Sequence, residues 1–351
     1  MKKSFIVLLA CLFMVSFAVP ASAKMVLKYA HVAPPTHGQH HGCVAFADYI
    51  KNKTKGEIQV DVFPMGQLGG ERSTLEQVQG GTLDICSSTT AVASNFVREV
   101  ALFDLSFLWP SREVGYKVLD DPDIQKIFFD LFPRKGMVAI GYTENDMRDI
   151  TNTKREIHSP EDMRDLKIRV MESPVYLDSF RQLGTSPVPM PFPEVYNALQ
   201  QGVIDAQDNP IMTSILMKFT EVCPYATLTN HILTECVIVV NIDLWKRLTP
   251  EQQKIFRDAA KLGIQVNRDS CKDLREKLIE QEASKGLKIV RLSPSERKAF
   301  MKVMEPVHKK YEKKAGKVLN KKEYGKYAGM TYYQLIQEKI NQYDTEKLTM
   351  K

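Results

Sequence analysis

Strand-like and helix-like segments alternate along the first part of the chain, and this alternation constrains the fold more than any other feature. Segments at 25–32, 57–63 and 83–86 are typical of short strands. The stretches between them, at 37–53 and 71–78, carry apolar residues at helical spacing. Such a rhythm, with loops of a few residues, predicts an α/β fold with a largely parallel sheet that helices cover on both faces.

The rhythm continues through the middle of the chain. Apolar segments predict strands at 137–142, 166–170, 203–206 and 237–240. Helical patterns begin at a capping segment, 159–162, and at 192–201. The 351 residues suggest about two domains. Because no repeat or low-complexity linker separates two parts, we expect ordered segments to join them, as in proteins with a hinged cleft.

One helical pattern is unusually long. It begins at Thr249-Pro250, with Gln252 placed as in a capping box, and it persists to about Ala283. A helix of thirty residues would measure about 45 Å, which is longer than one lobe is wide. The pattern alone allows two helices with a break near Gly263, or one helix that crosses between two lobes.

The first residues predict export from the cytoplasm. Two lysines precede an apolar run at 5–19, and Pro20-Ala21-Ser22-Ala23 supplies small residues for a signal peptidase. We therefore expect residues 1–23 to be a signal peptide that is cleaved after Ala23. The run is shorter than the ~20 apolar residues of a membrane anchor. Cys11 lies in the middle of the run rather than at its end, which disfavours a lipoprotein.

Charge and cysteine content do not indicate a nucleic-acid partner or a disulfide framework. The formal charge of +6 includes two signal-peptide lysines, and the lysines at 309–322 are typical of a solvated helix face. Five of the six cysteines follow the signal peptide, without a C-x-x-C pair. Cys223 and Cys236 are the nearest pair, but we expect free thiols because a domain of this size does not need disulfides.

The chemistry-bearing motifs are few. The sequence has no G-x-S-x-G, H-E-x-x-H, P-loop or G-x-G-x-x-G motif, which weakens the case for an enzyme. Four histidines, His31, His37, His40 and His41, could be metal ligands. Their spacing matches no ligand motif, so we expect them to cap a helix and line the mouth of a cleft, and we expect no metal.

The stronger constellation is cationic. Alternation in the strand 166–170 places Ile168 and Val170 on one face and Arg169 on the other, at the strand's carboxyl end. In open α/β sheets that end is where ligands bind. A guanidinium can hold a carboxylate through two parallel hydrogen bonds. The pattern also allows a solvated arginine at a strand end.

Two other polar residues follow predicted strands. Arg148 follows the strand 137–142, and Asn209 follows the strand 203–206. A side-chain amide in such a loop can bridge a ligand and the backbone. Individually, both are ordinary loop residues.

Five segments together resemble the solute receptors of TRAP transporters, the DctP-type extracytoplasmic binding proteins. These segments are 63–72, 166–170, 189–196, 202–210 and 229–231, in the order and spacing of the family. The resemblance implies a two-lobe periplasmic binding protein fold with a hinged ligand cleft. It also implies one long helix bridging both lobes.

From this resemblance we place lobe 1 at residues 24–146 plus about 235–275. Lobe 2 then takes residues 147–234 plus about 276–351.

The resemblance also implies roles for individual residues. Arg169 would be the main carboxylate clamp, with Arg148 and Asn209 assisting and Phe192 packing on the ligand body. His31 and Thr89 would face the cleft from lobe 1. The supporting residues would be Asp208, His231 and Glu172, of which Glu172 adds an acceptor near the cleft. Relatives that bind sialic acid carry a glutamate where Thr89 stands and an asparagine where His31 stands, which disfavours sialic acid.

The sequence thus predicts a non-enzymatic periplasmic receptor that captures a small carboxylate and delivers it to TRAP membrane permease subunits. We expect a monomer without a cofactor. Two alternatives stay open: an exported metal-binding protein using the four histidines, and a secreted hydrolase with Asp208 and His231 as acid and base. Small dicarboxylates, keto acids and aromatic acids all remain candidate ligands.

Overall fold

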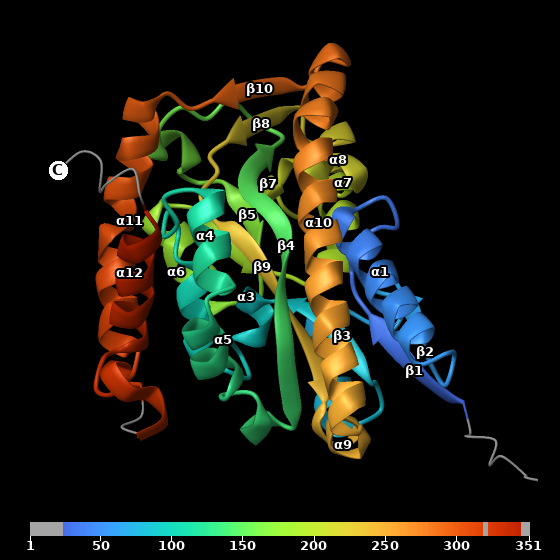
Figure 1. Ribbon diagram of the computed structural model, residues 1–351. Coiled ribbons are helices and arrows are strands. Elements are labelled where there is room, and N and C mark those ends of the chain that lie inside the picture. The colour runs from blue at the N-terminus through green and yellow to red at the C-terminus, as the bar shows by residue number, and fades with distance from the viewer. Residues whose placement is uncertain (1–23, 319–321, 345–351) are drawn as a thin grey trace, which may run out of the picture.

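The computed structural model describes residues 24–318 and 322–344 (Figure 1). The predicted signal peptide lies outside the described residues. The strands are β1 (Met25–Ala30), β2 (Ile58–Phe63), β3 (Ile85–Thr89), β4 (Met137–Asn152), β5 (Lys167–Val170), β6 (Ser186–Pro189), β7 (Ala206–Pro210), β8 (Tyr225–Leu228), β9 (Leu233–Asn241) and β10 (Lys288–Arg291).

Twelve α-helices lie in the described part of the chain. They are α1 (Gly38–Lys53), α2 (Glu71–Gly80), α3 (Thr90–Ala93), α4 (Arg112–Leu119), α5 (Pro122–Phe129), α6 (Pro174–Gln182), α7 (Val195–Gln200), α8 (Ile211–Leu216), α9 (Ile242–Arg247), α10 (Pro250–Ser284), α11 (Pro294–Lys314) and α12 (Tyr332–Tyr343). Short 3-10 helices are η1 (Arg98–Asp104), η2 (Pro133–Lys135), η3 (Pro160–Met163), η4 (Phe192–Glu194), η5 (Phe219–Glu221) and η6 (Lys322–Tyr327). The capping segment at 159–162 therefore begins a single 3-10 turn and not a longer helix.

The described strands form one mixed sheet in the order β2-β1-β3-β9-β4-β7-β5-β6, with β8 beside β4 and β10 beside β8. Pairs near the two ends of this order are parallel, as in β1–β2 and β5–β6. The central strands β9 and β4 instead pair antiparallel with each other and with β3 and β7. The α/β class is confirmed, but the prediction of a largely parallel sheet is wrong at the centre of the molecule.

Strand β4 connects the two halves of this sheet. Its first part, residues 137–147, pairs with β9, and its last part, residues 148–152, pairs with β7 and β8. The register shifts between Glu144 and Met147. Asp146, inside this shift, has a φ of 64°, a left-handed conformation that a strand residue rarely adopts. The two halves therefore meet at a bulge in the one strand that they share.

Helix α10 also connects the two halves. It is continuous over 35 residues, begins with the predicted capping box of Thr249 and Gln252, and runs the length of the molecule beside β4 (Figure 1). The single helix implied by the resemblance is confirmed. Gly263 does not break the helix. The lack of a side chain at this position allows α1 to pack closely against α10, since a Cβ added there would lie 2.7 Å from the carbonyl oxygen of Gly42.

The Gly263→Ala substitution should therefore destabilise the fold. The new methyl group would push α1 and α10 apart, and overpacking of this kind typically costs ~1–3 kcal/mol. Urea unfolding followed by circular dichroism measures this cost. Gly80→Ala in α2 is the matched control, because a Cβ at Gly80 meets nothing within 4 Å. Equal stability of the two variants would contradict the close helix contact.

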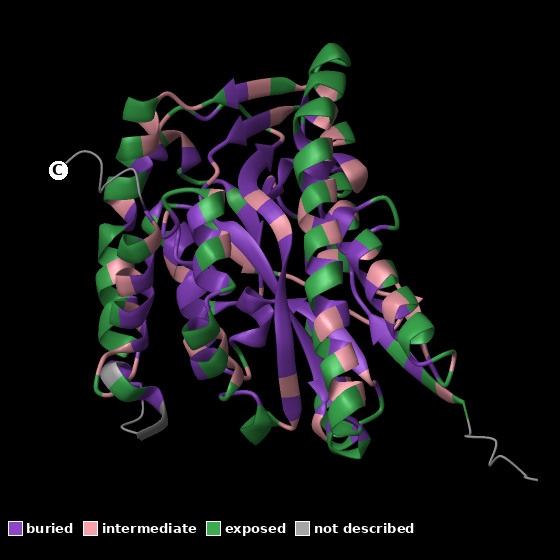
Figure 2. Cartoon of the chain, in the orientation of Figure 1, coloured by how far each residue is buried: buried purple, intermediate pink, exposed green. Residues whose placement is uncertain are grey.

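Buried apolar residues lie on both sides of the sheet, and the exposed surface is carried mainly by the outer faces of the helices (Figure 2). Helix α11 packs against α6 in the half that contains β5. Helix α12 instead packs against α4 in the other half. The predicted lobe boundaries stay a prediction, and the position of α12 favours assigning that helix to lobe 1.

The five described cysteines are all buried and free, which confirms the prediction of free thiols. Burial raises the pKa of Cys43 and of Cys223 to about 12. Among the described residues, no helix combines the length and the apolar character that crossing a membrane requires.

Candidate functional site

A small cavity lies where the two halves face each other. Its volume is about 20 Å³. Its wall combines residues that precede Asp146 in the chain with residues that follow it. The lining residues are Val32, Ala33, Gln39, Glu71, Thr89, Asn145, Arg148, Arg169, Met171, Phe192, Asn209 and Thr213. Five of the six predicted ligand-binding residues therefore line one cavity, although Thr89 and Asn209 are far apart in the sequence.

Arg169 is the most unusual residue of this cavity. It lies on β5 with 2% of its surface exposed. Its Nε and Nη2 both donate to the carbonyl oxygen of Met190, at 2.9 and 2.7 Å. Its Nη1 is buried without a hydrogen-bond partner among the described residues. Burial, together with the positive charge of Arg148, lowers the pKa of Arg169 to about 10, while Asp208 and Glu71 act against this fall.

The backbone carbonyl of Met190 fixes the orientation of this guanidinium. Met190 follows β6, which pairs in parallel with β5 along its whole length. The pairing places the Met190 carbonyl beside the Arg169 side chain, so two of its three nitrogens are held and the third is left for another acceptor.

Arg148, by contrast, is already paired. Its Nε donates to Asp208 Oδ2 at 2.5 Å, and its Nη2 donates to the backbone oxygen of Asp208. Its guanidinium also lies 5.2 Å from the centroid of the Tyr176 ring. Burial alone would raise the pKa of Asp208, but Arg148 and His231 outweigh it and hold that pKa at about 2. Arg148 thus lines the cavity, but its positive charge is already compensated by Asp208.

Asp208 and His231 lie behind Arg148 and not among the lining residues. His231 Nδ1 is 2.7 Å from Thr229 Oγ1, and its Nε2 is 3.6 Å from Asp208 Oδ2. Both residues therefore support the position of Arg148. This arrangement gives no support to an acid–base pair, since the carboxylate of Asp208 is committed to the arginine.

Two of the local structures expected around the site were wrong. Arg148 and Asn209 were expected in loops after strands, but both lie inside strands that pair antiparallel, β4 and β7. Strand β7 begins at Ala206, where the predicted strand ended. Asn209 nevertheless lines the cavity, and its Nδ2 donates to Gln207 Oε1 at 2.5 Å.

The sequence analysis missed three polar residues in the first half of the wall, Glu71, Gln39 and Asn145, of which the first two lie at the starts of helices. Glu71, the first residue of α2, accepts hydrogen bonds from the backbone N–H and the hydroxyl of Thr89, each at 2.9 Å. Gln39, in the first turn of α1, has a buried Nε2 without a partner among the described residues. Glu71 and Gln39 could have been identified from their position, because each lies at the start of a helix, directly after the loop that follows β2 or β1.

His31 and Glu172 lie outside the lining residues. His31 is buried, and its Nε2 is 3.1 Å from Nδ1 of His40. Burial lowers the pKa of His31 to about 3, so it is neutral. The backbone oxygen of Glu172 accepts from Asn95 Nδ2 at 2.7 Å, a contact between the two predicted lobes near the cavity.

The other histidines have separate local roles. His37 caps α1 by accepting from the backbone N–H of Gln39, and His41 contacts Ser270. Within the described residues, no three histidine, cysteine or acidic side chains are arranged to hold a metal ion. The geometry therefore does not favour a metal site at this cluster.

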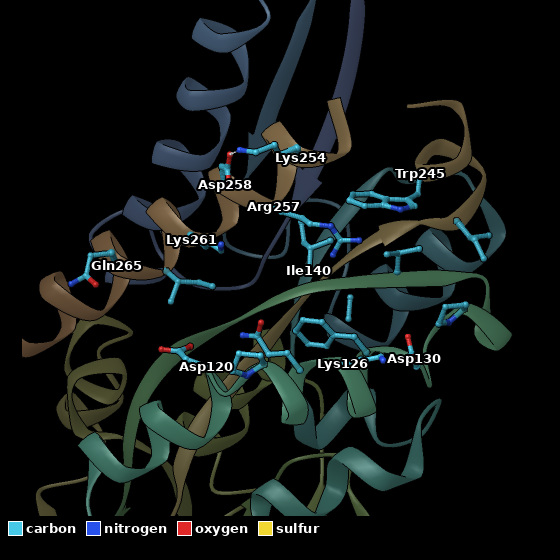
Figure 3. Close-up of a pocket in the computed structure, with 18 of the residues that line it drawn as sticks. Asp120, Lys126, Asp130, Ile140, Trp245, Lys254, Arg257, Asp258, Lys261 and Gln265 are labelled. Atoms are coloured by element: carbon cyan, nitrogen blue, oxygen red, sulfur yellow. Dashed lines mark hydrogen bonds and ion pairs between the residues drawn. The ribbon is translucent and has the colours of Figure 1, made fainter. Parts of the chain in front are cut away.

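A much larger groove, of about 1050 Å³, lies on the outer face of the molecule. Figure 3 shows it between α10 and the segment that includes Asp120 and Lys126 of α5, with Ile140 of β4 between them. Several of its charged groups already have partners: Lys254 contacts Asp258 at 2.5 Å, and Arg257 lies 4.9 Å from the Trp245 ring centroid. Arg268 has a buried Nε without a partner among the described residues, but its Nη1 and Nη2 donate to the Asp120 carboxylate at 2.6 and 3.0 Å, so its charge is compensated. The groove is open to solvent, and size alone does not make it the ligand site.

The family of bacterial extracellular solute-binding proteins, family 7 (DctP), matches residues 29–314. The chain is 31% identical to the 2,3-diketo-L-gulonate-binding periplasmic protein YiaO of Escherichia coli K12, over 81% of this chain and 86% of that one. Among solved structures it is similar to a TRAP periplasmic solute-binding protein from Polaromonas sp. JS666 bound to D-erythronate, with 30% identity, a TM-score of 0.81, and 90% and 98% of the two chains covered. It is also similar to a TRAP periplasmic solute-binding protein from Sulfurospirillum deleyianum with bound succinate, with 29% identity, a TM-score of 0.80, and 92% and 99% covered.

Proposed function

Because this chain belongs to the DctP family of bacterial extracellular solute-binding proteins, we propose that it captures a small organic acid at Arg169 and delivers it to the membrane subunits of a TRAP transporter. The carboxylate of the acid would accept a hydrogen bond from Arg169 Nη1. The similar receptors with bound D-erythronate and succinate support an acid as the ligand class.

The observation that carries this proposal is the unpartnered Nη1 of Arg169 in the cavity wall. A buried guanidinium without an ion-pair partner in contact is costly, and proteins keep such groups mainly where a ligand completes the pair. A carboxylate would supply the missing acceptor and a negative charge in direct contact with Nη1. Charge-assisted hydrogen bonds of this kind are short and about twice as strong as neutral ones.

The cavity must widen for the acid to enter. A volume of about 20 Å³ holds roughly one water molecule, whereas a four-carbon acid needs several times that space. Contacts such as that between Asn95 and Glu172 hold the two sides of the opening together. We propose that the lobes part about β4 and α10, the segments that run between them, and close again on the ligand.

Small-angle X-ray scattering tests this opening. The radius of gyration of the free protein should exceed that of the acid-bound protein, because the bound acid favours the closed state. An Arg169→Met variant should show no change when the same acid is added. Identical profiles for free and acid-bound wild-type protein would argue against a hinge.

We also propose that the receptor is exported to the periplasm and that it is a monomer. Support for export comes from the signal-peptide pattern at 1–23 and from the extracellular family. The mass of the protein purified from the periplasm tests export and cleavage, because a chain cleaved after Ala23 begins at Lys24. Light scattering of the same sample checks the monomer.

A further inference from the structure

The cavity wall contains a second charged group whose position bears on which acid can bind. Glu71 is buried, with 7% of its surface exposed, and it lines the same cavity as Arg169. It approaches from α2, whereas Arg169 approaches from β5. A ligand that fills this cavity therefore meets one anionic and one cationic side chain.

Thr89 holds the Glu71 carboxylate in a fixed orientation. The backbone N–H of Thr89 donates to Oε1, and its hydroxyl donates to Oε2, both at 2.9 Å. Two donors on two different oxygens suit an ionised carboxylate, because neither contact requires a proton on Glu71. Each oxygen retains the capacity to accept one more hydrogen bond. Burial raises the pKa of Glu71, and the Thr89 hydrogen bonds together with the positive charge of Arg169 act against this rise.

Arg169 is the one cation among the residues that line the cavity that remains available to pair with a ligand carboxylate. Arg148 is compensated by Asp208 at 2.5 Å, so the cation left without a close partner is Arg169. A first carboxylate would pair with Arg169. A second carboxylate on the same ligand would enter a buried space beside Glu71 without a free cation to meet it, and buried like charges strongly disfavour such an arrangement. A hydroxyl group at that point would instead donate to Glu71.

We infer that Glu71 is a specificity-determining residue, which selects hydroxylated acids with a single carboxylate and rejects dicarboxylates. This inference rests on the proposed anchoring of a carboxylate at Arg169. Glu71 would accept hydrogen bonds from hydroxyl groups of the ligand. Gln39 would donate to a further hydroxyl oxygen, because its buried Nε2 lacks a partner among the described residues.

Two matched pairs of acids test this inference by isothermal titration calorimetry. D-erythronate is compared with meso-tartrate, and galactonate with galactarate. In each pair the carbon chain is the same, and the second acid carries a carboxylate in place of a terminal hydroxymethyl group. The wild-type protein should bind at least one monocarboxylate ~100-fold more tightly than its dicarboxylate partner.

The Glu71→Gln variant should reduce this preference at least ~10-fold, because an amide of equal size no longer repels the second carboxylate. Glu76→Gln, an equivalent change on the exposed face of the same helix, should leave the preference unchanged; Glu76 pairs with Arg72 at 3.2 Å with about half of its side chain exposed. Thermal unfolding of each variant establishes that it is folded. The wild-type preference tests the inference even if Glu71→Gln does not fold.

Three results would overturn the inference: equal or tighter binding of the dicarboxylates by the wild type, an unchanged preference in Glu71→Gln, or no binding of any of the four acids. In the first two cases, acid binding that is lost in Arg169→Met would leave the proposed function intact while refuting the role of Glu71. Loss of the preference in Glu71→Gln but not in Glu76→Gln would support that role.

Discussion

Replacing Arg169 with methionine is expected to weaken the binding of the receptor's acid at least ~30-fold, because removal of one partner of a desolvated charge pair typically costs ~2–5 kcal/mol. Methionine fills a similar length of the cavity wall without a charge or a donor. Titration calorimetry with the acid that the wild-type protein binds most tightly measures the loss.

The same substitution should not lower stability, which distinguishes a ligand anchor from a structural arginine. Arg169 is buried with Nη1 unpartnered, so its removal relieves the cost of burying a charged group that has no ion-pair partner in contact. We expect the free energy of unfolding in urea to stay equal or to rise. Lys167→Ala, on the same strand but exposed, is the control and should change neither property. Unchanged acid affinity in Arg169→Met would refute the anchor.

Replacing Asp208 with asparagine is expected to be the most destabilising of the changes considered. It leaves the buried Arg148 without its counter-charge, and breaking a buried ion pair by removing one partner typically costs ~3–5 kcal/mol. Urea unfolding at neutral pH measures the loss. Asp205→Asn, in the partly exposed pair with Lys154, should cost less than ~1 kcal/mol. Equal effects of the two substitutions would contradict the buried pair.

The pH dependence of stability follows from the same pair. The pKa of Asp208 is held at about 2, below its ordinary value of 3.8. A depressed carboxylate pKa stabilises the folded state above the ordinary pKa, and this contribution is lost as the pH falls through the folded value. Wild-type stability should therefore fall between about pH 4 and pH 2 more steeply than that of Asp208→Asn. Parallel curves for the two proteins would show that Asp208 does not carry this dependence.

The sequence predicts local structure well where the whole pattern lies within one short segment. The capping box at Thr249 and the apolar run at 237–240 produce a helix and a strand close to their expected places. The direction of β4 and β9 within the sheet could not be predicted, because it depends on partners far away in the chain. The length of β4 was missed for a related reason: its second half, from Thr143 to Asn152, is mostly polar, and it is buried by β7, β8 and β9 together with helices α8 and α10.

The site was predicted less completely than the fold. A resemblance carries over residues that match a motif, and three of the residues that it named, Arg169, Arg148 and Asn209, line one cavity. It named Arg169 as the main clamp and Arg148 as assisting, but it did not indicate that Asp208 compensates the charge of Arg148, because the sequence does not display that hydrogen-bond geometry. Glu71 was missed since, in the sequence, it is one more acidic residue in the first turn of a helix.

A crystal structure of the wild-type protein with its acid bound tests the central claim most directly. The account predicts a carboxylate oxygen of the ligand within about 3 Å of Arg169 Nη1, with the Met190 carbonyl still holding the other two nitrogens of the guanidinium. An acid bound elsewhere, such as in the groove beside α10, with Arg169 making no contact to it, would contradict the account.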